Sequence, residues 1–222
     1  MRLPDGLDAI RMYTERTLSF LIVWGSLFVC ISSPTSADGY DKFRTPCTPD
    51  QTLMVKATIA EAKSILTKTI QVLPPRNSTI GNKFRRWFGG REGESDDTLQ
   101  KIYSEILSFI DAKIFWCANR TNVGREDTVA FVRKGSFFEI FIMGSFFFDA
   151  PNSGADSKAG TLIHEASHQA TVARIVDSDV TGDGKPDYGI SNAEQLARTR
   201  PDRARRTGDN LEYFAEDIAY GI

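Results

Sequence analysis

The most constraining feature of this chain is the pentapeptide His164-Glu165-Ala166-Ser167-His168, which holds both of its histidines. Helical positions i and i+4 share a face, so a helix through this segment points both imidazoles in one direction. The segment 158–173 has apolar residues at positions that favour such a helix. We therefore expect a helix whose polar face presents two imidazoles to one site.

Two imidazoles on one helix face are suited to zinc, and the HExxH pattern places a carboxylate beside them. Glu165 can then hold a water without ligating the metal. The alternative is a polar helix face with two ordinary histidines. The helical context, an export signal described below and the absence of any other histidine favour zinc.

A catalytic zinc needs a third protein ligand. The longer metzincin motif fails here, because Thr171 and Arg174 stand where its glycine and third histidine would be. A glutamate on a later helix is one alternative, and Glu194 is the candidate. An aspartate is the other, and the segment between offers Asp177, Asp179, Asp183 and Asp187.

The rest of the pattern predicts an α+β fold, with helices around a small, mainly antiparallel sheet. Helical spacing covers 49–72, 99–109, 158–173, 192–200 and 209–219. Residues 128–132 and 137–141 are rich in β-branched and aromatic side chains, which predicts a hairpin. The polar, glycine-rich stretch 76–97 is expected to be a loop.

Residues 1–37 are expected to be a secretory signal, followed by one domain over 38–222. The run 18–31 is uncharged and almost wholly apolar, and its fourteen residues suit a signal better than a membrane span. Small Thr35 and Ala37 follow, which predicts cleavage after Ala37. A buried core helix is the alternative. The mature chain is then extracellular or periplasmic and free of the membrane.

Cleavage leaves two cysteines, Cys47 and Cys117. In an exported chain they predict one disulfide, and two free thiols are the alternative. The 27 basic and 29 acidic residues give a net charge of −2, which argues against nucleic-acid binding as the main function. We expect a monomer that acts on protein or peptide substrates.

Oxygen-bearing side chains alternate over 179–187, and a glycine follows the third of them. This arrangement is typical of loops that wrap Ca²⁺. The alternative is a solvated acidic turn. Bound Ca²⁺ would share Asp187 with zinc or withdraw it from zinc.

Segments outside the pentapeptide add a more specific pattern. They are Arg86-Trp87-Phe88-Gly89, 150–168, Tyr188-Gly189, Leu196-Ala197, Pro201-Asp202 and 209–216. Together they resemble the aspzincins, the M35-type family of deuterolysin and peptidyl-Lys metalloendopeptidase, over nearly all of the mature chain. The resemblance implies a zincin-like fold and a secreted zinc endopeptidase that cuts on the amino side of lysine. Cys47 and Cys117 also match one of the family's disulfides.

The resemblance implies catalytic roles as well. Glu165 becomes the general base and the Tyr188 hydroxyl stabilises the oxyanion. The family's third zinc ligand is an aspartate three residues before this tyrosine, but that position holds Lys185. A slipped register makes Asp187 the expected ligand beside His164 and His168, with Asp183 as the alternative.

Asp209 and Glu212 have two interpretations. Their spacing at a helix start is that of a capping box, whereas the family resemblance places them in the pocket for a substrate lysine. The competing function is a catalytically inactive secreted module that keeps the fold and binds calcium or a protein partner. The Lys185 departure is the main support for that alternative.

Overall fold

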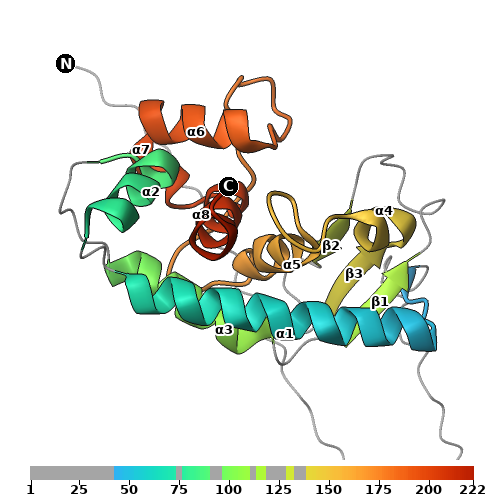
Figure 1. The fold of residues 1–222 in the computed structure, drawn as a ribbon. Helices are drawn as coiled ribbons and strands as arrows, with labels where there is room; N and C mark the ends of the chain where they lie inside the picture. Colours follow the sequence, from blue (N-terminus) through green and yellow to red (C-terminus); the bar gives the residue numbers. More distant parts are fainter. Residues whose placement is uncertain (1–42, 74–76, 91–96, 111–113, 119–128, 133–138) are drawn as a thin grey trace, which may run out of the picture. The chain divides into compact units, whose positions relative to one another are not determined.

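The computed structural model describes residues 43–73, 77–90, 97–110, 114–118, 129–132 and 139–222 (Figure 1). The predicted signal at 1–37 lies outside these residues. Within the described ranges, no helix combines the length and the apolar character that a membrane span requires.

The described residues form helices in two groups along the chain, separated by three short strands (Figure 1). The elements are α1 (Pro49–Val72), α2 (Ser78–Phe88), α3 (Asp97–Ile110), β1 (Ile114–Ala118), β2 (Ala130–Val132), β3 (Glu139–Met143), α4 (Gly144–Asp149), α5 (Lys158–Ser167), α6 (Ile190–Thr199), α7 (Pro201–Ala204) and α8 (Gly208–Tyr220).

The sheet is mixed, with strand order β1-β3-β2. β2 and β3 pair antiparallel, as the predicted hairpin requires, with Phe131 opposite Phe141. β1 was not predicted, and it pairs parallel to β3 with Cys117 opposite Ile142. The α+β prediction is confirmed, but the expected mainly antiparallel sheet is corrected to a mixed one.

The segment 76–97 contains a helix where a loop was expected. Asn77 caps α2, since its side chain accepts a hydrogen bond of 2.9 Å from the amide of Ile80. Phe84, Trp87 and Phe88 follow at helical spacing and are buried. The polar composition of the segment masked this amphipathic pattern, whose apolar face packs against α8.

α5 lies at the centre of the main core and packs against α1, α3, α8 and β2. Its fully buried Leu162 and Ile163 share this core with Tyr103 of α3 and Phe214 of α8. The Tyr103 hydroxyl donates a hydrogen bond of 2.8 Å to the Leu211 carbonyl and links α3 to α8. The helix that carries the histidines is therefore held from several sides.

The predicted disulfide between Cys47 and Cys117 is present, with a sequence separation of 70 residues. The Cys117 amide also donates a hydrogen bond of 2.8 Å to the Thr45 carbonyl. Together these contacts join the segment before α1 to β1. In the chain-entropy model, a closed loop of this length stabilises the fold by about 4 kcal/mol.

Candidate metal centre

The N-terminus of α5 is fixed to α8 by a buried glutamate. Glu216 accepts hydrogen bonds from the amides of Asp156 (3.2 Å) and Ser157 (2.8 Å), and the Ser157 hydroxyl caps the helix by accepting from the Gly160 amide (2.9 Å). A side chain at Gly160 would overlap the Glu216 carboxylate. Glycine therefore allows the close approach of the two helices.

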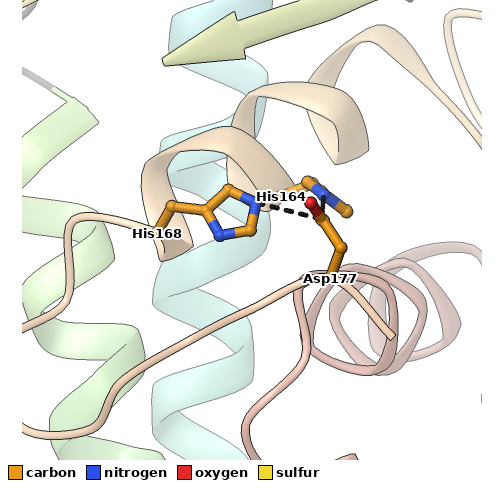
Figure 2. A group of neighbouring side chains, drawn as sticks. All are labelled: His164, His168 and Asp177. Atoms are coloured by element: carbon orange, nitrogen blue, oxygen red, sulfur yellow. Dashed lines mark hydrogen bonds and ion pairs between the residues drawn. The ribbon is translucent and has the colours of Figure 1, made fainter. Parts of the chain in front are cut away.

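His164 of α5 and His168, the C-cap of this helix, lie against Asp177, which is in the irregular segment that follows (Figure 2). Asp177 Oδ1 is 3.2 Å from His164 Nε2 and 3.3 Å from His168 Nε2. Zinc bonds of about 2.0–2.2 Å at tetrahedral angles separate neighbouring ligand atoms by about 3.4 Å. The donor types and their spacing therefore fit a zinc ion held by His164, His168 and Asp177.

The electrostatics of the cluster favour a positive charge. Burial lowers the pKa of His164, but Asp177, Asp209 and Glu212 outweigh it and raise that pKa well above its ordinary value. Burial raises the pKa of Asp177, and the two histidines outweigh that effect and lower it. The carboxylates that surround His164 can compensate a cation in the same way.

The structure does not bring Asp187, the expected third ligand, to the histidines. Asp187 Oδ2 accepts hydrogen bonds from the amides of Val180 and Thr181, both at 2.7 Å, and from the Thr181 hydroxyl at 3.0 Å. Asp183, the alternative, accepts a hydrogen bond from the Lys185 amide at 2.9 Å. Both carboxylates bond within the loop itself, so Asp177, and not the expected Asp187, lies with the two histidines in the structure.

The loop 179–187 does not support the calcium interpretation. Asp179 accepts hydrogen bonds from the amides of Gly182 (2.6 Å) and Gly184 (3.2 Å), so its carboxylate, like those of Asp183 and Asp187, faces backbone amides. Among the described residues, the groups of three possible metal ligands both include His164. None of them contains an acid of this loop.

Glu194, the other candidate for the third ligand, lies elsewhere. It is on α6, and its carboxylate is 2.7 Å from Arg86 and 3.6 Å from Arg198. It belongs to neither of the metal-ligand groups found in the described part of the chain. This placement removes the hypothesis of a glutamate ligand from a later helix.

A cleft of about 640 Å³ opens beside the three candidate ligands, and its lining includes Val132, Glu165, His168, Asp177 and Tyr188. The Val132 amide in β2 donates a hydrogen bond to the Glu165 carboxylate. Burial raises the pKa of Glu165, and the neighbouring histidines only partly oppose this shift. The cleft thus holds a partly desolvated carboxylate next to the candidate zinc site.

Residues 75–216 match the family model described as lysine-specific metallo-endopeptidase, the aspzincins. The chain belongs to this family. The resemblance seen in the sequence segments is therefore confirmed, and the family is one of metallo-endopeptidases.

Individual relatives of this aspzincin agree with the family match. An extracellular protease of Aeromonas hydrophila is 30% identical over 189 residues, or 84% of this chain and 50% of that protein. A peptidyl-Lys metalloendopeptidase of Grifola frondosa is 26% identical over 96% of this chain and 57% of that protein. The chain thus spans about half the length of these curated relatives.

The fold is also similar to a solved structure. A zinc peptidase from Grifola frondosa superposes with a TM-score of 0.65 at 27% identity, covering 78% of this chain and 99% of that one. This similarity supports the predicted zincin-like architecture of helices around a small sheet.

In this aspzincin, Asp209 and Glu212 lie beside His164. Asp209 Oδ1 is 3.1 Å and Glu212 Oε2 is 3.3 Å from His164 Nδ1, at the opposite edge of the ring from Asp177. The capping-box interpretation is wrong, because α8 begins one residue before Asp209 and its N-cap, Thr207, makes no side-chain cap bond. A side chain at Gly208 would come within 2.7–2.9 Å of the His164 ring.

Asp209 also positions Tyr188. Its Oδ2 accepts a hydrogen bond of 2.8 Å from the Gly189 amide. The rings of Tyr188 and His164 have centroids 6.1 Å apart, and Tyr188 keeps 52% of its surface exposed. Burial of the hydroxyl and nearby acids raise the Tyr188 pKa to about 12, so the hydroxyl remains a hydrogen-bond donor at neutral pH.

Sequence patterns did not indicate Glu105, which holds the turn between the histidines and Asp177. This α3 carboxylate accepts hydrogen bonds from the amides of Thr171 (2.6 Å) and Val172 (3.1 Å) and from the Thr171 hydroxyl (2.8 Å). Burial raises the pKa of Glu105, and these hydrogen bonds outweigh it and lower the pKa. No local motif links residues so far apart in sequence.

We expect Glu105→Ala to weaken zinc binding by about 10- to 100-fold, the range typical of residues that orient metal ligands. The turn loses its anchor, so Asp177 is held less firmly against the histidines. Zinc affinity from competition with a chelator checks this, with exposed Lys101→Ala of the same helix as the control. Equal zinc affinities of the two variants would contradict the assigned role.

Proposed function

We propose that this protein is a secreted zinc-dependent endopeptidase that cuts on the amino side of lysine. The observation that carries the proposal is the convergence of His164, His168 and Asp177 at zinc-ligand spacing, with Glu165 facing the same cleft. Family membership supports the same activity. Intact Glu165 and Tyr188, together with a ligand set that does not involve Lys185, argue against an inactive module.

Bound zinc supplies Lewis acidity and makes water acidic enough to lose a proton near neutral pH. Glu165 takes that proton from the attacking water and delivers it to the leaving amine. Its raised pKa suits both steps, because a carboxylate with a higher proton affinity is a stronger base. The Val132 amide keeps this carboxylate oriented in the cleft.

The Tyr188 hydroxyl donates a hydrogen bond to the oxyanion that develops at the scissile carbonyl. Its side chain lines the cleft and lies beside His164. The Gly189 amide, bound to Asp209, fixes the backbone next to it. Asp209 therefore couples the position of Tyr188 to that of a metal ligand.

The two acids beside His164 support the proposed recognition of lysine. A single Nδ1–H cannot donate a full hydrogen bond to both Asp209 and Glu212, which lie 3.1 and 3.3 Å away. Asp209 is further engaged by Gly189, so Glu212 is the freer of the two. Burial raises the pKa of Glu212, and a substrate ammonium would reverse that penalty by pairing with its charged form.

Export is supported by the apolar run at 18–31 and by the disulfide, which persists in oxidising compartments. We expect the mature protein to begin at Asp38. N-terminal sequencing of the protein recovered from the medium or the periplasm checks this. An intracellular protein that still begins at Met1 would contradict it.

We expect Glu212→Gln to lower kcat/KM for cleavage before lysine, with a loss of about 2–4 kcal/mol in transition-state binding, because a buried ammonium loses its counter-charge. Cut sites in a denatured protein, mapped by mass spectrometry alongside zinc content, test the activity and its specificity together. Glu194→Gln, a helix acid outside the site, is the control. Cuts spread evenly over residue types would reject lysine recognition, and an uncut substrate at full zinc occupancy would reject the activity.

A further inference from the structure

We infer that the peptide bond between Gly184 and Lys185 is a self-cleavage site, cut in one copy of this protein by the active site of another. This inference rests on the proposed cleavage before lysine. Lys185 lies in the irregular loop between Asp177, the candidate third ligand, and Tyr188. The position that breaks the family pattern is therefore also the side chain that the enzyme is proposed to recognise.

Lys185 differs from the other described lysines because its backbone is not helical. A peptidase binds its substrate as an extended chain, so a lysine within a stable helix is protected until that helix unfolds. Among the described residues, Lys185 is the lysine that lies outside a helix. The others are in α1, α2, α3 and α5: Lys56, Lys63, Lys68, Lys83, Lys101 and Lys158.

The loop tip can open without disturbing the core. Residues 181–185 are all exposed, and Gly182 and Gly184 lack side chains that could pack. Opening breaks the hydrogen bonds from the Gly184 amide to Asp179 (3.2 Å) and from the Lys185 amide to Asp183 (2.9 Å), both exposed to solvent. Exposed loop tips held in this way are the usual sites of proteolytic nicking.

The base of the loop limits that opening to the tip. The Asp187 amide donates a hydrogen bond of 2.6 Å to the Ser178 carbonyl, and the Asp187 carboxylate accepts from Val180 and Thr181. These contacts join the segment before the proposed cut to the segment after it, and they remain when the tip opens. Asp187, expected as a metal ligand, thus holds the two ends of this loop together.

Cleavage is a hydrolysis that consumes one solvent water. The C–N bond between Gly184 and Lys185 breaks, Gly184 gains a carboxylate and Lys185 gains an α-amino group. The fragment 185–222 contains α6 and the buried α8, which packs against α1, α2 and α5. We therefore expect the two pieces to remain associated under native conditions and to separate only in denaturant.

The test uses a Glu165→Gln chain as substrate and a small amount of the active enzyme, with a denatured lysine-containing protein in the same tube. We expect a fragment that begins at Lys185, identified by mass spectrometry, and its loss in the Glu165→Gln/Lys185→Gln chain. In parallel, limited digestion of the Glu165→Gln chain with a broad-specificity protease should place an early cut within 181–186. That measurement reports loop access without relying on this enzyme.

The outcomes separate the two proposals. If the denatured protein is cut before lysine while the folded chain stays intact at Gly184–Lys185, self-cleavage is wrong and the proposed function stands. If the denatured protein is not cut before lysine, both proposals fail. An early cut by the broad-specificity protease only outside 181–186 also overturns self-cleavage, because the loop would then be closed.

Discussion

Replacing Asp177 with alanine is expected to reduce zinc affinity by more than about 100-fold and to abolish peptidase activity at ordinary zinc concentrations. Residues that merely orient metal ligands already change metal affinity by 10- to 100-fold, and a lost ligand costs more. Asp177 Oδ1 lies 3.2 and 3.3 Å from the two imidazoles, so its removal opens the cluster. Zinc affinity by chelator competition measures the effect.

The matched control for Asp177→Ala is Asp187→Ala. Asp187 bonds the amides of Val180 and Thr181 within the loop, so its loss should loosen that loop and leave zinc affinity close to that of the wild type. Thermal unfolding without zinc separates the effects, because Asp187→Ala loses hydrogen bonds that do not depend on metal. Release of zinc by Asp187→Ala alone would restore the original expectation and reject Asp177.

The sequence pattern indicated two of the three candidate zinc ligands but not the third. The pairing of the two imidazoles follows from helical geometry, although α5 ends at Ser167, short of the expected residue 173, and His168 is its C-cap. The third ligand depends on where a loop is longer than usual. A ligand position counted back from Tyr188 depends on the length of the loop 179–187. A position counted forward from His168 does not, because Asp177 precedes that loop. A sequence count cannot tell which end of a loop carries an insertion.

Other differences have a similar physical origin. Helical spacing predicted α1 and α3 well because each has one buried face, whereas α8 is buried on all sides from Gly208 to Asp217. β1 is only five residues long, and its partner β3 lies beyond β2 in the chain, so local periodicity is a weak signal for it. The contacts of Glu105 are likewise determined by packing between segments distant in sequence.

Asp209 illustrates the limit for site residues. Its spacing to Glu212 suits a capping box, and that interpretation needs α8 to start after Asp209. The helix instead starts at Gly208, where the absent side chain lets the backbone approach the His164 ring. The tertiary contact therefore overrides the local capping signal, and Asp209 binds His164 and the Gly189 amide.

Glu165→Gln is expected to lower kcat by about 10²- to 10⁴-fold, the contribution typical of a general base, while zinc binds with unchanged stoichiometry. Glutamine keeps the size of the side chain and an oxygen that can accept from the Val132 amide, but it cannot take a proton. Stability should not fall, because burial already disfavours the charged carboxylate and raises its pKa. Steady-state kinetics, zinc content and thermal unfolding measure the three quantities.

Glu165→Asp is the matched variant, since it retains a carboxylate but withdraws it by one methylene from the position beside the cluster. It should keep more activity than Glu165→Gln if proton transfer is the role of this residue, because a base can still act through a longer contact or a water. Near-native turnover of Glu165→Gln would reject the base assignment. Loss of zinc from Glu165→Gln would instead identify this residue as a ligand, which the spacing of His164, His168 and Asp177 argues against.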